Sequence, residues 1–147
     1  MINLKPVGYV KTNVQDQQVA KCRADIISEI IIESEWSESL LNIEQYSHIF
    51  VLFWLHKTES ETVEQQIFPR GDKNLPLTGI FATRSRNRPN PIGMAVVELL
   101  KRKGNSLTVK RLDAFDGTPI LDIKPYDDYD VFENVDVPAW WAKRCRK

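Results

Sequence analysis

The chain has 147 residues, enough for a single domain to bury a core without disulfide or metal cross-links. Hydrophobic residues make up 42% of it and charged residues 27%, which excludes a disordered or fibrous protein. Twenty basic residues balance twenty acidic ones, so net charge does not favour a nucleic-acid partner, and such a surface must be built from local clusters. We expect one domain over residues 1–147.

The N-terminus and the cysteines carry no targeting or metal-binding pattern. The opening sequence MINLKPVGYV lacks the apolar centre of a signal peptide, and no run approaches the roughly 20 apolar residues that cross a bilayer. Cys22 and Cys145 have no neighbouring His or Cys at metal-ligand spacing. These patterns predict a cytoplasmic protein with reduced thiols, without a membrane span or a metal.

The first part of the chain contains two predicted strands with a loop between them. Residues 4–12 have a strand pattern with Gly8 inside it, which indicates a bulge or the close approach of another backbone. Residues 13–22 are polar and rich in glutamine, so we expect a loop there. The run 24–32 is rich in isoleucine and too short for a convincing helix, which favours a strand.

A helix and a buried strand are expected next. Apolar residues recur every three or four positions over residues 35–46, with Ser37 near the start as a candidate cap, and this spacing predicts a short helix. Residues 48–56 are nearly all apolar, with many β-branched and aromatic side chains. This composition predicts a strand that is covered on both faces and lies at the centre of the fold.

The second half of the chain contains further predicted strands. One begins in LTGIFATRS, residues 77–85. Strands over 93–103 and 107–115 are joined by a turn that contains glycine and asparagine, so they are expected to form a hairpin. A short last strand is expected at 120–123.

Together these elements indicate a fold class. Five or six short strands with one or two short helices, joined by hairpin-length turns, predict a mainly all-β fold, a small antiparallel β-barrel. No GxGxxG sequence follows a strand, so a cofactor that contains adenosine would need another kind of site. Near the C-terminus, Trp140 and Trp141 are bulky enough to anchor the tail on an apolar surface.

The segment FATRSRNRPNPIG, residues 81–93, which we call the arginine loop, is the strongest candidate for a functional site. Pro89 and Pro91 fix backbone angles and favour extended conformations at the residues before them, so the loop is expected to be stiff. The planar guanidinium groups of Arg84 and Arg88 suit bidentate contacts with carboxylate or phosphate. This combination predicts an anionic ligand.

The arginines of the loop could also have a purely structural role. The arginines could pair with the acidic residues in 127–130 and only hold the loop in place. Two other basic runs, residues 101–103 and 143–147, have the pattern that is typical of solvated surfaces.

Three segments, YSHIFVLFWLHK, GIFATRSRNRPNPIG and LDAFDGTPILDIKPY, resemble the three successive motifs of the TsaA-like family. Together with PVGYVKT they cover most of the chain, in the same order and spacing as in the family. The resemblance implies an all-β barrel, a homodimer, and S-adenosyl-L-methionine bound near the dimer interface. It also implies a methyltransferase that acts on N6 of threonylcarbamoyl-adenosine at position 37 of tRNA.

The resemblance also implies which residues of this chain contact the cofactor and the tRNA. The cofactor contacts that it implies are His56, Lys57, Arg84, Met94, Asp116, Gly117, Thr118 and Pro119. The expected contacts to the tRNA substrate are Arg86, Arg88 and Asn90. Structural readings stay open as well, since His56 could be a hydrogen-bonded residue at a strand end and Asp116 with Gly117 could form a turn.

Methyl transfer from a sulfonium requires alignment of two substrates and movement of one proton, without a metal. Because N6 carries a carbonyl substituent, it must lose its proton, and a nearby carboxylate or phenol would help. Asp116 and Tyr126 are the candidates for this catalytic role. Asp113, Asp122 and Tyr129 lie close in sequence, and geometry must decide between them.

Two departures from the family pattern bear on the site. The first long loop, VQDQQVAKCRAD, lacks the Pro-Arg-Gln that family members commonly carry, and Gln15, Gln17 or Gln18 are the candidate substitutes. The family's bacterial methyltransferases continue into a C-terminal extension, so tRNA contacts made by that extension are expected to come from elsewhere or to be absent.

Two other functions were weighed against methyl transfer. A nucleotide- or RNA-binding module without transfer activity would have no donor site, so S-adenosylmethionine would leave its thermal stability unchanged. A hydrolase with His56 and Asp116 as a catalytic pair lacks a credible nucleophile, because no Ser occupies a GxSxG-like turn.

Overall fold

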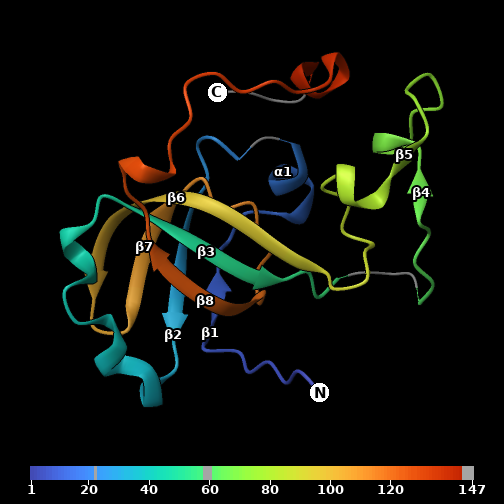
Figure 1. Cartoon of the computed structure of the whole chain (residues 1–147). Helices are drawn as coiled ribbons and strands as arrows, with labels where there is room; N and C mark the ends of the chain where they lie inside the picture. Colours follow the sequence, from blue (N-terminus) through green and yellow to red (C-terminus); the bar gives the residue numbers. More distant parts are fainter. Residues whose placement is uncertain (22, 58–60, 144–147) are drawn as a thin grey trace.

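The computed structural model of the chain describes residues 1–21, 23–57 and 61–143. Six strands form a closed antiparallel barrel in the order β1-β2-β7-β6-β3-β8 (Figure 1). These strands are β1 (Gly8–Lys11), β2 (Ile27–Ile32), β3 (His48–Trp54), β6 (Ile92–Lys103), β7 (Ser106–Lys110) and β8 (Pro119–Pro125). The predicted antiparallel β-barrel is confirmed. The predictions for Cys22 and for residues 144–147, including Cys145, concern residues outside the described ranges.

Shorter elements lie outside the barrel. The strands β4 (Gln66–Ile67) and β5 (Thr78–Gly79) pair in a lobe to one side of it, at the right in Figure 1. The helices are α1 (Asp16–Lys21) and the 3-10 helices η1 (Ser34–Leu40), η2 (Ile43–Gln45), η3 (Pro69–Gly71), η4 (Ile80–Ala82), η5 (Asp128–Asp130) and η6 (Ala139–Lys143). None of the helices in the described residues is both long and apolar enough to cross a membrane.

The core fills the barrel interior with alternate residues of each strand. In β3, Ile49, Val51 and Phe53 are buried, whereas the residues between them are only half-buried. The strand pairs with β6 on one edge and β8 on the other, so its predicted central position is confirmed. The prediction that both of its faces are covered was wrong, because a strand of a closed barrel turns only one face to the interior.

Several local predictions differ from the structure. The predicted loop at 13–22 contains α1, and the predicted α-helix at 35–46 is replaced by the 3-10 helices η1 and η2. Asn42 lies between them with φ 70°, a left-handed conformation that interrupts a helix. Ser37 lies inside η1 and is not its cap; the capping position is Glu33, whose side chain makes no capping hydrogen bond.

Five predicted strands are shorter in the structure, including those at 4–12 and 48–56, which are β1 and β3. The strand at 24–32 begins only at Ile27, because Arg23–Ile26 form a turn in which the Ile26 amide donates to the Arg23 carbonyl at 3.1 Å. The strand predicted in 77–85 contains only β5 before the chain enters η4. The predicted hairpin is confirmed as β6 and β7, although β7 ends before Arg111, which has φ 79°.

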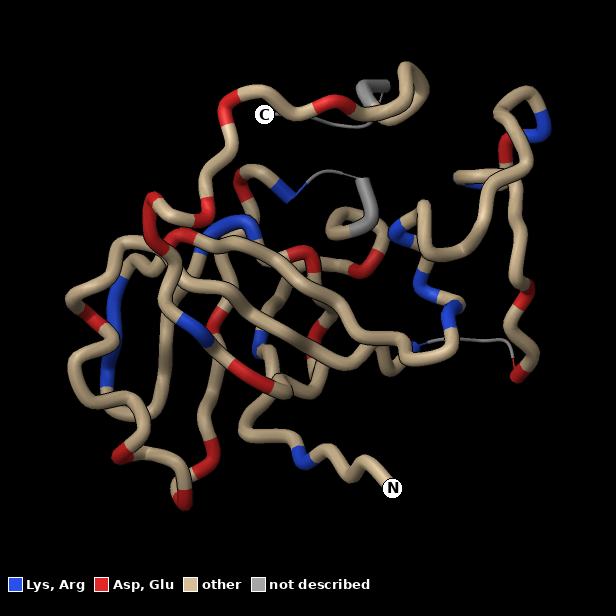
Figure 2. Tube along the Cα trace, in the orientation of Figure 1, with Lys and Arg blue, Asp and Glu red and all other residues tan. Residues whose placement is uncertain are grey.

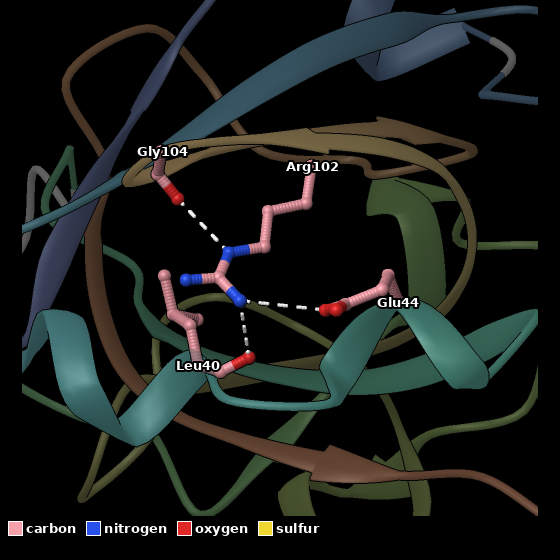
Figure 3. A network of polar contacts seen from close by, with 4 residues as sticks. All are labelled: Leu40, Glu44, Arg102 and Gly104. Atoms are coloured by element: carbon pink, nitrogen blue, oxygen red, sulfur yellow. Dashed lines mark hydrogen bonds and ion pairs between the residues drawn. The ribbon is translucent and has the colours of Figure 1, made fainter.

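Charged residues are spread over the barrel, and basic residues follow one another closely in the arginine loop (Figure 2). Arg102 in the basic run 101–103 differs from its exposed lysine neighbours because its guanidinium makes structural contacts (Figure 3). Its Nη1 donates to the Leu40 carbonyl at 2.9 Å and approaches Glu44 Oε2 at 3.4 Å, and its Nε donates to the Gly104 carbonyl at 3.0 Å. These bonds attach the η1–η2 connection to the β6–β7 hairpin.

Barrel closure depends on the absence of a side chain at Gly8. This residue pairs with Ile32 of β2 and with Ile120 of β8. A Cβ atom at this position would overlap the backbone carbonyl oxygen of Ile31. The close approach of another backbone, predicted from the sequence, is confirmed.

We expect Gly8→Ala to lower the free energy of unfolding by about 1–3 kcal/mol, because the added methyl group forces the backbone of β1 away from β2. Gly79→Ala is the matched control, since Gly79 has φ −61° and a Cβ there meets nothing within 4 Å. Urea unfolding of both variants checks the expectation. Equal losses of stability in the two variants would contradict it.

Candidate active site

A cavity of about 720 Å³ lies at the barrel end where β3 ends and β6 begins. Apolar walls come from Phe53 and Leu55 at the end of β3 and from Ile92 and Met94 of β6. Further walls come from the arginine loop, from the connection that precedes β8, and from single residues of α1 and η6. The volume lies in the range of sites for small organic ligands.

The arginine loop forms one side of the cavity and is held by internal hydrogen bonds. Arg88 Nη1 donates to the carbonyl oxygens of Thr83 and Ser85 at 3.0 and 3.1 Å. The Thr83 hydroxyl donates to the Ile80 carbonyl at 2.8 Å. Arg88 therefore shapes the loop from within, and no contact between the loop arginines and residues 127–130 is found among the described residues.

Arg86 presents the clearest ligand-binding feature of the cavity. The centre of its guanidinium lies 4.3 Å from the ring centroid of Phe115. Its Nε is buried and has no hydrogen-bond partner in the described part of the chain. A buried donor without a partner costs free energy, which a ligand with an acceptor atom would recover.

Lys57 and α1 complete the surroundings of Phe115. The Lys57 ammonium lies 5.4 Å from the Phe115 ring centroid and forms an ion pair with Asp16 of α1, with 2.6 Å between Nζ and Oδ2. His56 lies beside these groups. Burial and the positive charges of Lys57 and Arg86 lower the pKa of His56 below its ordinary value of 6.5, and Asp16 acts in the opposite direction.

The segment 116–118 forms a turn that places Thr118 in the cavity wall. The Asp116 carboxylate accepts a hydrogen bond from the Thr12 amide at 2.9 Å. Gly117 has φ 79°, which favours glycine, and its amide donates to the Val10 carbonyl at 2.8 Å. Thr118 is buried and lines the cavity. Asp116 and Gly117 therefore form a turn, which is one of the two roles that the sequence allowed for them. Thr118 is the residue of this segment that lies in the cavity wall.

The structure brings together some of the expected site residues and leaves others apart. Those that line the cavity are Arg84, Arg86, Arg88, Met94 and Thr118. Those that do not line it are His56, Lys57, Asn90, Asp116, Gly117, Pro119 and Tyr126. His56 and Lys57 are nevertheless coupled to it electrostatically through Arg86 and Phe115.

Tyr126, a candidate catalytic residue, lies at the opposite end of β3 from the cavity. Its amide donates to the His48 carbonyl at 3.3 Å, and its ring packs edge-on against Phe50 at 5.4 Å. The structure does not bring its phenol to the cavity. Asp113 and Asp122 were the other acidic candidates for the catalytic base. Asp122 forms an ion pair with Lys124, whereas Asp113 lines the cavity and contacts Arg23 at 3.1 Å.

Several cavity residues were missed by sequence reasoning. Phe115 and Phe53 lie in segments whose motifs were singled out, but nothing in the sequence indicated that their rings face the site. Val19 reaches the cavity from α1, which was expected to be a loop, while the candidate substitutes Gln15, Gln17 and Gln18 are exposed. Trp141 lines the cavity, so the expected anchoring of the tail occurs at the site itself. The described residues contain no group of three or more His, Cys, Asp or Glu that could hold a metal ion.

The barrel and its cavity define the class of this protein. The cavity wall combines apolar side chains with polar and charged ones, among them a buried arginine Nε without a partner in the described residues, and this combination suits a small organic ligand with an anionic group. The protein is a small antiparallel barrel with a candidate ligand site at one end.

The sequence profile of the tRNA-methyltransferase O N-terminal domain matches residues 11–131, and the chain belongs to this family. An S-adenosyl-L-methionine-binding protein of Archaeoglobus fulgidus is 42% identical over 126 residues, which cover 84% of this chain and 88% of that protein. The human tRNA (adenine(37)-N6)-methyltransferase is 36% identical over 143 residues, which cover 91% of this chain and 32% of that protein. The crystal structure of TrmO from Pseudomonas aeruginosa matches with a TM-score of 0.72 and 28% identity, over 92% of this chain and 61% of that one.

The chain matches only part of the length of some relatives and most of the length of others. The chain spans about three fifths of the solved TrmO chain and about a third of the human methyltransferase. It spans most of the A. fulgidus protein and 80% of a probable S-adenosyl-L-methionine-binding protein of Pyrococcus abyssi, to which it is 37% identical. The likeness to the TsaA-like family inferred from the motifs is confirmed.

The pKa of His56 gives a direct test of the charges around the cavity. We expect an NMR titration of its ring to have a midpoint below 6.5, because burial and two neighbouring cations favour the neutral imidazole. The neutral form is then favoured in the folded state, so the stability it contributes is present above pH 6.5 and is lost as the pH falls through the folded-state pKa. Lys57→Ala should move the midpoint upward. A midpoint at or above 6.5 in the unmodified protein would contradict the described surroundings.

Proposed function

We propose that the protein is an S-adenosylmethionine-dependent methyltransferase that acts on N6 of threonylcarbamoyl-adenosine at position 37 of tRNA. Family membership supports the reaction class, and the archaeal relatives, named as S-adenosyl-L-methionine-binding proteins, support the methyl donor. The human relative, named as a tRNA (adenine(37)-N6)-methyltransferase, supports the target nitrogen. The motifs of the TsaA-like family add the threonylcarbamoyl group of the substrate.

The observation that carries the proposal is the unpartnered Nε of Arg86 in a cavity with apolar walls. S-adenosylmethionine combines an adenosine part with a carboxylate. Phe53, Leu55 and Met94 would face the adenosine part, and Arg86 would donate to an acceptor such as the carboxylate. Thr118 adds a hydroxyl to the same wall. The residues present therefore fit the donor.

The chemistry requires a proton acceptor in addition to the donor. When bound, the donor would supply a methyl group to the N6 lone pair, and the electron pair of the broken C–S bond would stay on sulfur. The N6 proton must pass to a base. Asp113 is the carboxylate that lines the cavity among the described residues, so we assign it this role in place of Asp116 and Tyr126.

A homodimer in the cytoplasm is part of the proposal. Phe81 is 81% exposed and Met94 is 53% exposed, and both lie at the cavity. Exposed apolar side chains beside a ligand site are typical of an interface, and the resemblance to the TsaA-like family implies that the cofactor lies near one. Light scattering of the purified protein measures the oligomeric state.

The enzyme assay uses labelled S-adenosylmethionine with tRNA that does or does not carry the threonylcarbamoyl group. We expect transfer to the modified tRNA, and a loss of about 100-fold or more in rate for Asp113→Asn, because general-base catalysis contributes roughly 10²- to 10⁴-fold. Asp122→Asn is the matched control, since Asp122 contacts Lys124 and does not line the cavity. Equal rates for the two variants would exclude Asp113 as the base.

A nucleotide- or RNA-binding module without transfer activity is the second candidate. It is favoured by one observation, that neither Asp116 nor Tyr126 lines the cavity and the carboxylate that does, Asp113, is paired with Arg23. For such a module, S-adenosylmethionine would not raise the melting temperature and no methyl group would reach tRNA. For the methyltransferase, both effects are expected in the same preparation.

A further inference from the structure

A second cavity, of about 370 Å³, adjoins the larger one on the side of the β4–β5 lobe. Its walls are residues 67–71, residues 83–86 of the arginine loop, and Trp140 and Trp141 of η6. Residues 83–86 and Trp141 line both cavities. Ligands in the two cavities would therefore lie against the same side chains.

The second cavity combines aromatic rings with arginine side chains. The guanidinium centre of Arg70 lies 5.5 Å from the ring centroid of Trp140, and that of Arg84 lies 5.6 Å from the ring centroid of Trp141. Arg70 Nη2 also donates to the Trp141 carbonyl at 3.3 Å. These contacts connect η6 with the lobe and the arginine loop, and three residues with aromatic rings, Phe68, Trp140 and Trp141, line the cavity.

The charge of these arginines is not neutralised by carboxylates within the described part of the chain. The ion pairs found there involve Arg23, Lys57, Arg102 and Lys124. Basic residues of the arginine loop lie beside the lobe (Figure 2). The surface around the second cavity thus offers N–H donors to an anion.

Arg70 also has an unusual backbone conformation. Its φ of 58° and ψ of 17° lie in the left-handed region, and Gly71 follows with φ 69°. A non-glycine residue in this region is uncommon, and such outliers cluster at ligand sites. The conformation belongs to the turn that supplies Phe68, Pro69 and Arg70 to the cavity.

We propose that the second cavity receives the acceptor nucleotide of the RNA substrate. Its base lies against the rings of Phe68 and Trp140, and its phosphate is held by Arg70 and Arg84. Aromatic and guanidinium planes that stack an unpaired base, with cations for the backbone, are how proteins recognise single-stranded RNA. The inference rests on the proposed function, because it places the acceptor next to the cavity assigned to the methyl donor.

An acidic peptide or a second copy of this chain could also use the arginines. Neither of these two ligands explains why three aromatic rings line one cavity of this size. A planar base explains it better, because bases stack on aromatic rings. Residues 83–86 and Trp141 line both cavities and so place the second cavity beside the one assigned to the methyl donor, which is a second reason for a nucleotide there.

The test measures binding of a fluorescein-labelled anticodon stem-loop RNA by fluorescence anisotropy in the presence of S-adenosylhomocysteine. We expect Trp140→Ala to weaken RNA binding by roughly 5- to 150-fold, the range for loss of one stacked base. Arg70→Gln should weaken it as well and should reduce the salt dependence, log Kd against log salt, by about 0.7. Trp36→Ala is the matched control, because Trp36 is 38% exposed in η1 and lines neither cavity.

Calorimetry with S-adenosylhomocysteine separates the two sites. Trp140 and Arg70 line only the second cavity, so both variants keep every side chain of the donor cavity and should still bind this ligand. If the unmodified protein binds RNA through Trp140 but binds no S-adenosylhomocysteine, the proposed function fails while the nucleotide site stands. Unchanged RNA affinity in folded Trp140→Ala or Arg70→Gln would overturn the nucleotide site.

Light scattering identifies the alternative role of the second cavity. If Trp140→Ala alters the mass measured by light scattering and leaves RNA affinity unchanged, the second cavity is an interface between copies. If that variant does not fold, as shown by its melting curve, Arg70→Gln decides the outcome, because Arg70 is an exposed residue.

Discussion

The pairing of β1 with β8 closes the barrel, and the ligand site is built on that closure. The two strands share two pairs, Gly8 with Ile120 and Tyr9 with Pro119, whereas β3 pairs with β6 along its whole length. The turn before β8 is attached to the same strand, because the Val10 amide donates to the Thr118 carbonyl at 2.9 Å and Val10 accepts from Gly117. This turn follows Phe115 and precedes Thr118 in the cavity wall, so loss of the closure would displace the site.

Phe115 links the electrostatics of the site to the fold. Arg86 and Lys57 both lie near its ring, and Lys57 is held in turn by Asp16 of α1. An aromatic ring attracts a cation but, unlike a carboxylate, has no opposite net charge to neutralise it. A cation beside a ring can therefore still bind an anion. The arginine loop thus places positive charge at the margin of the cavity, whereas α1 contributes the acidic Asp16. Burial, together with the charges of Lys57 and Arg86, lowers the pKa of His56.

The sequence predicted the barrel because it indicated five or six short strands joined by hairpin-length turns. It also placed Arg84, Met94 and Thr118 at the site through the family motifs. It could not predict which end of the barrel a residue occupies. Thr118 and Tyr126 flank the seven residues of β8, and at about 3.3 Å per residue this strand separates them by roughly 20 Å or more. Partners that depend on tertiary packing, such as Arg86 with Phe115, leave no local signal.

Arg86 is the side chain through which the cavity at the end of β3 is proposed to bind the methyl donor. The most direct test is a calorimetric titration of the unmodified protein and of Arg86→Lys with S-adenosylhomocysteine. The substitution keeps a positive charge but removes the buried Nε donor and the planar group on Phe115. Loss of a hydrogen bond to a charged group costs about 1.5–3 kcal/mol, so the predicted result is binding that is roughly 10- to 100-fold weaker. Equal affinity in a folded Arg86→Lys variant would contradict the account.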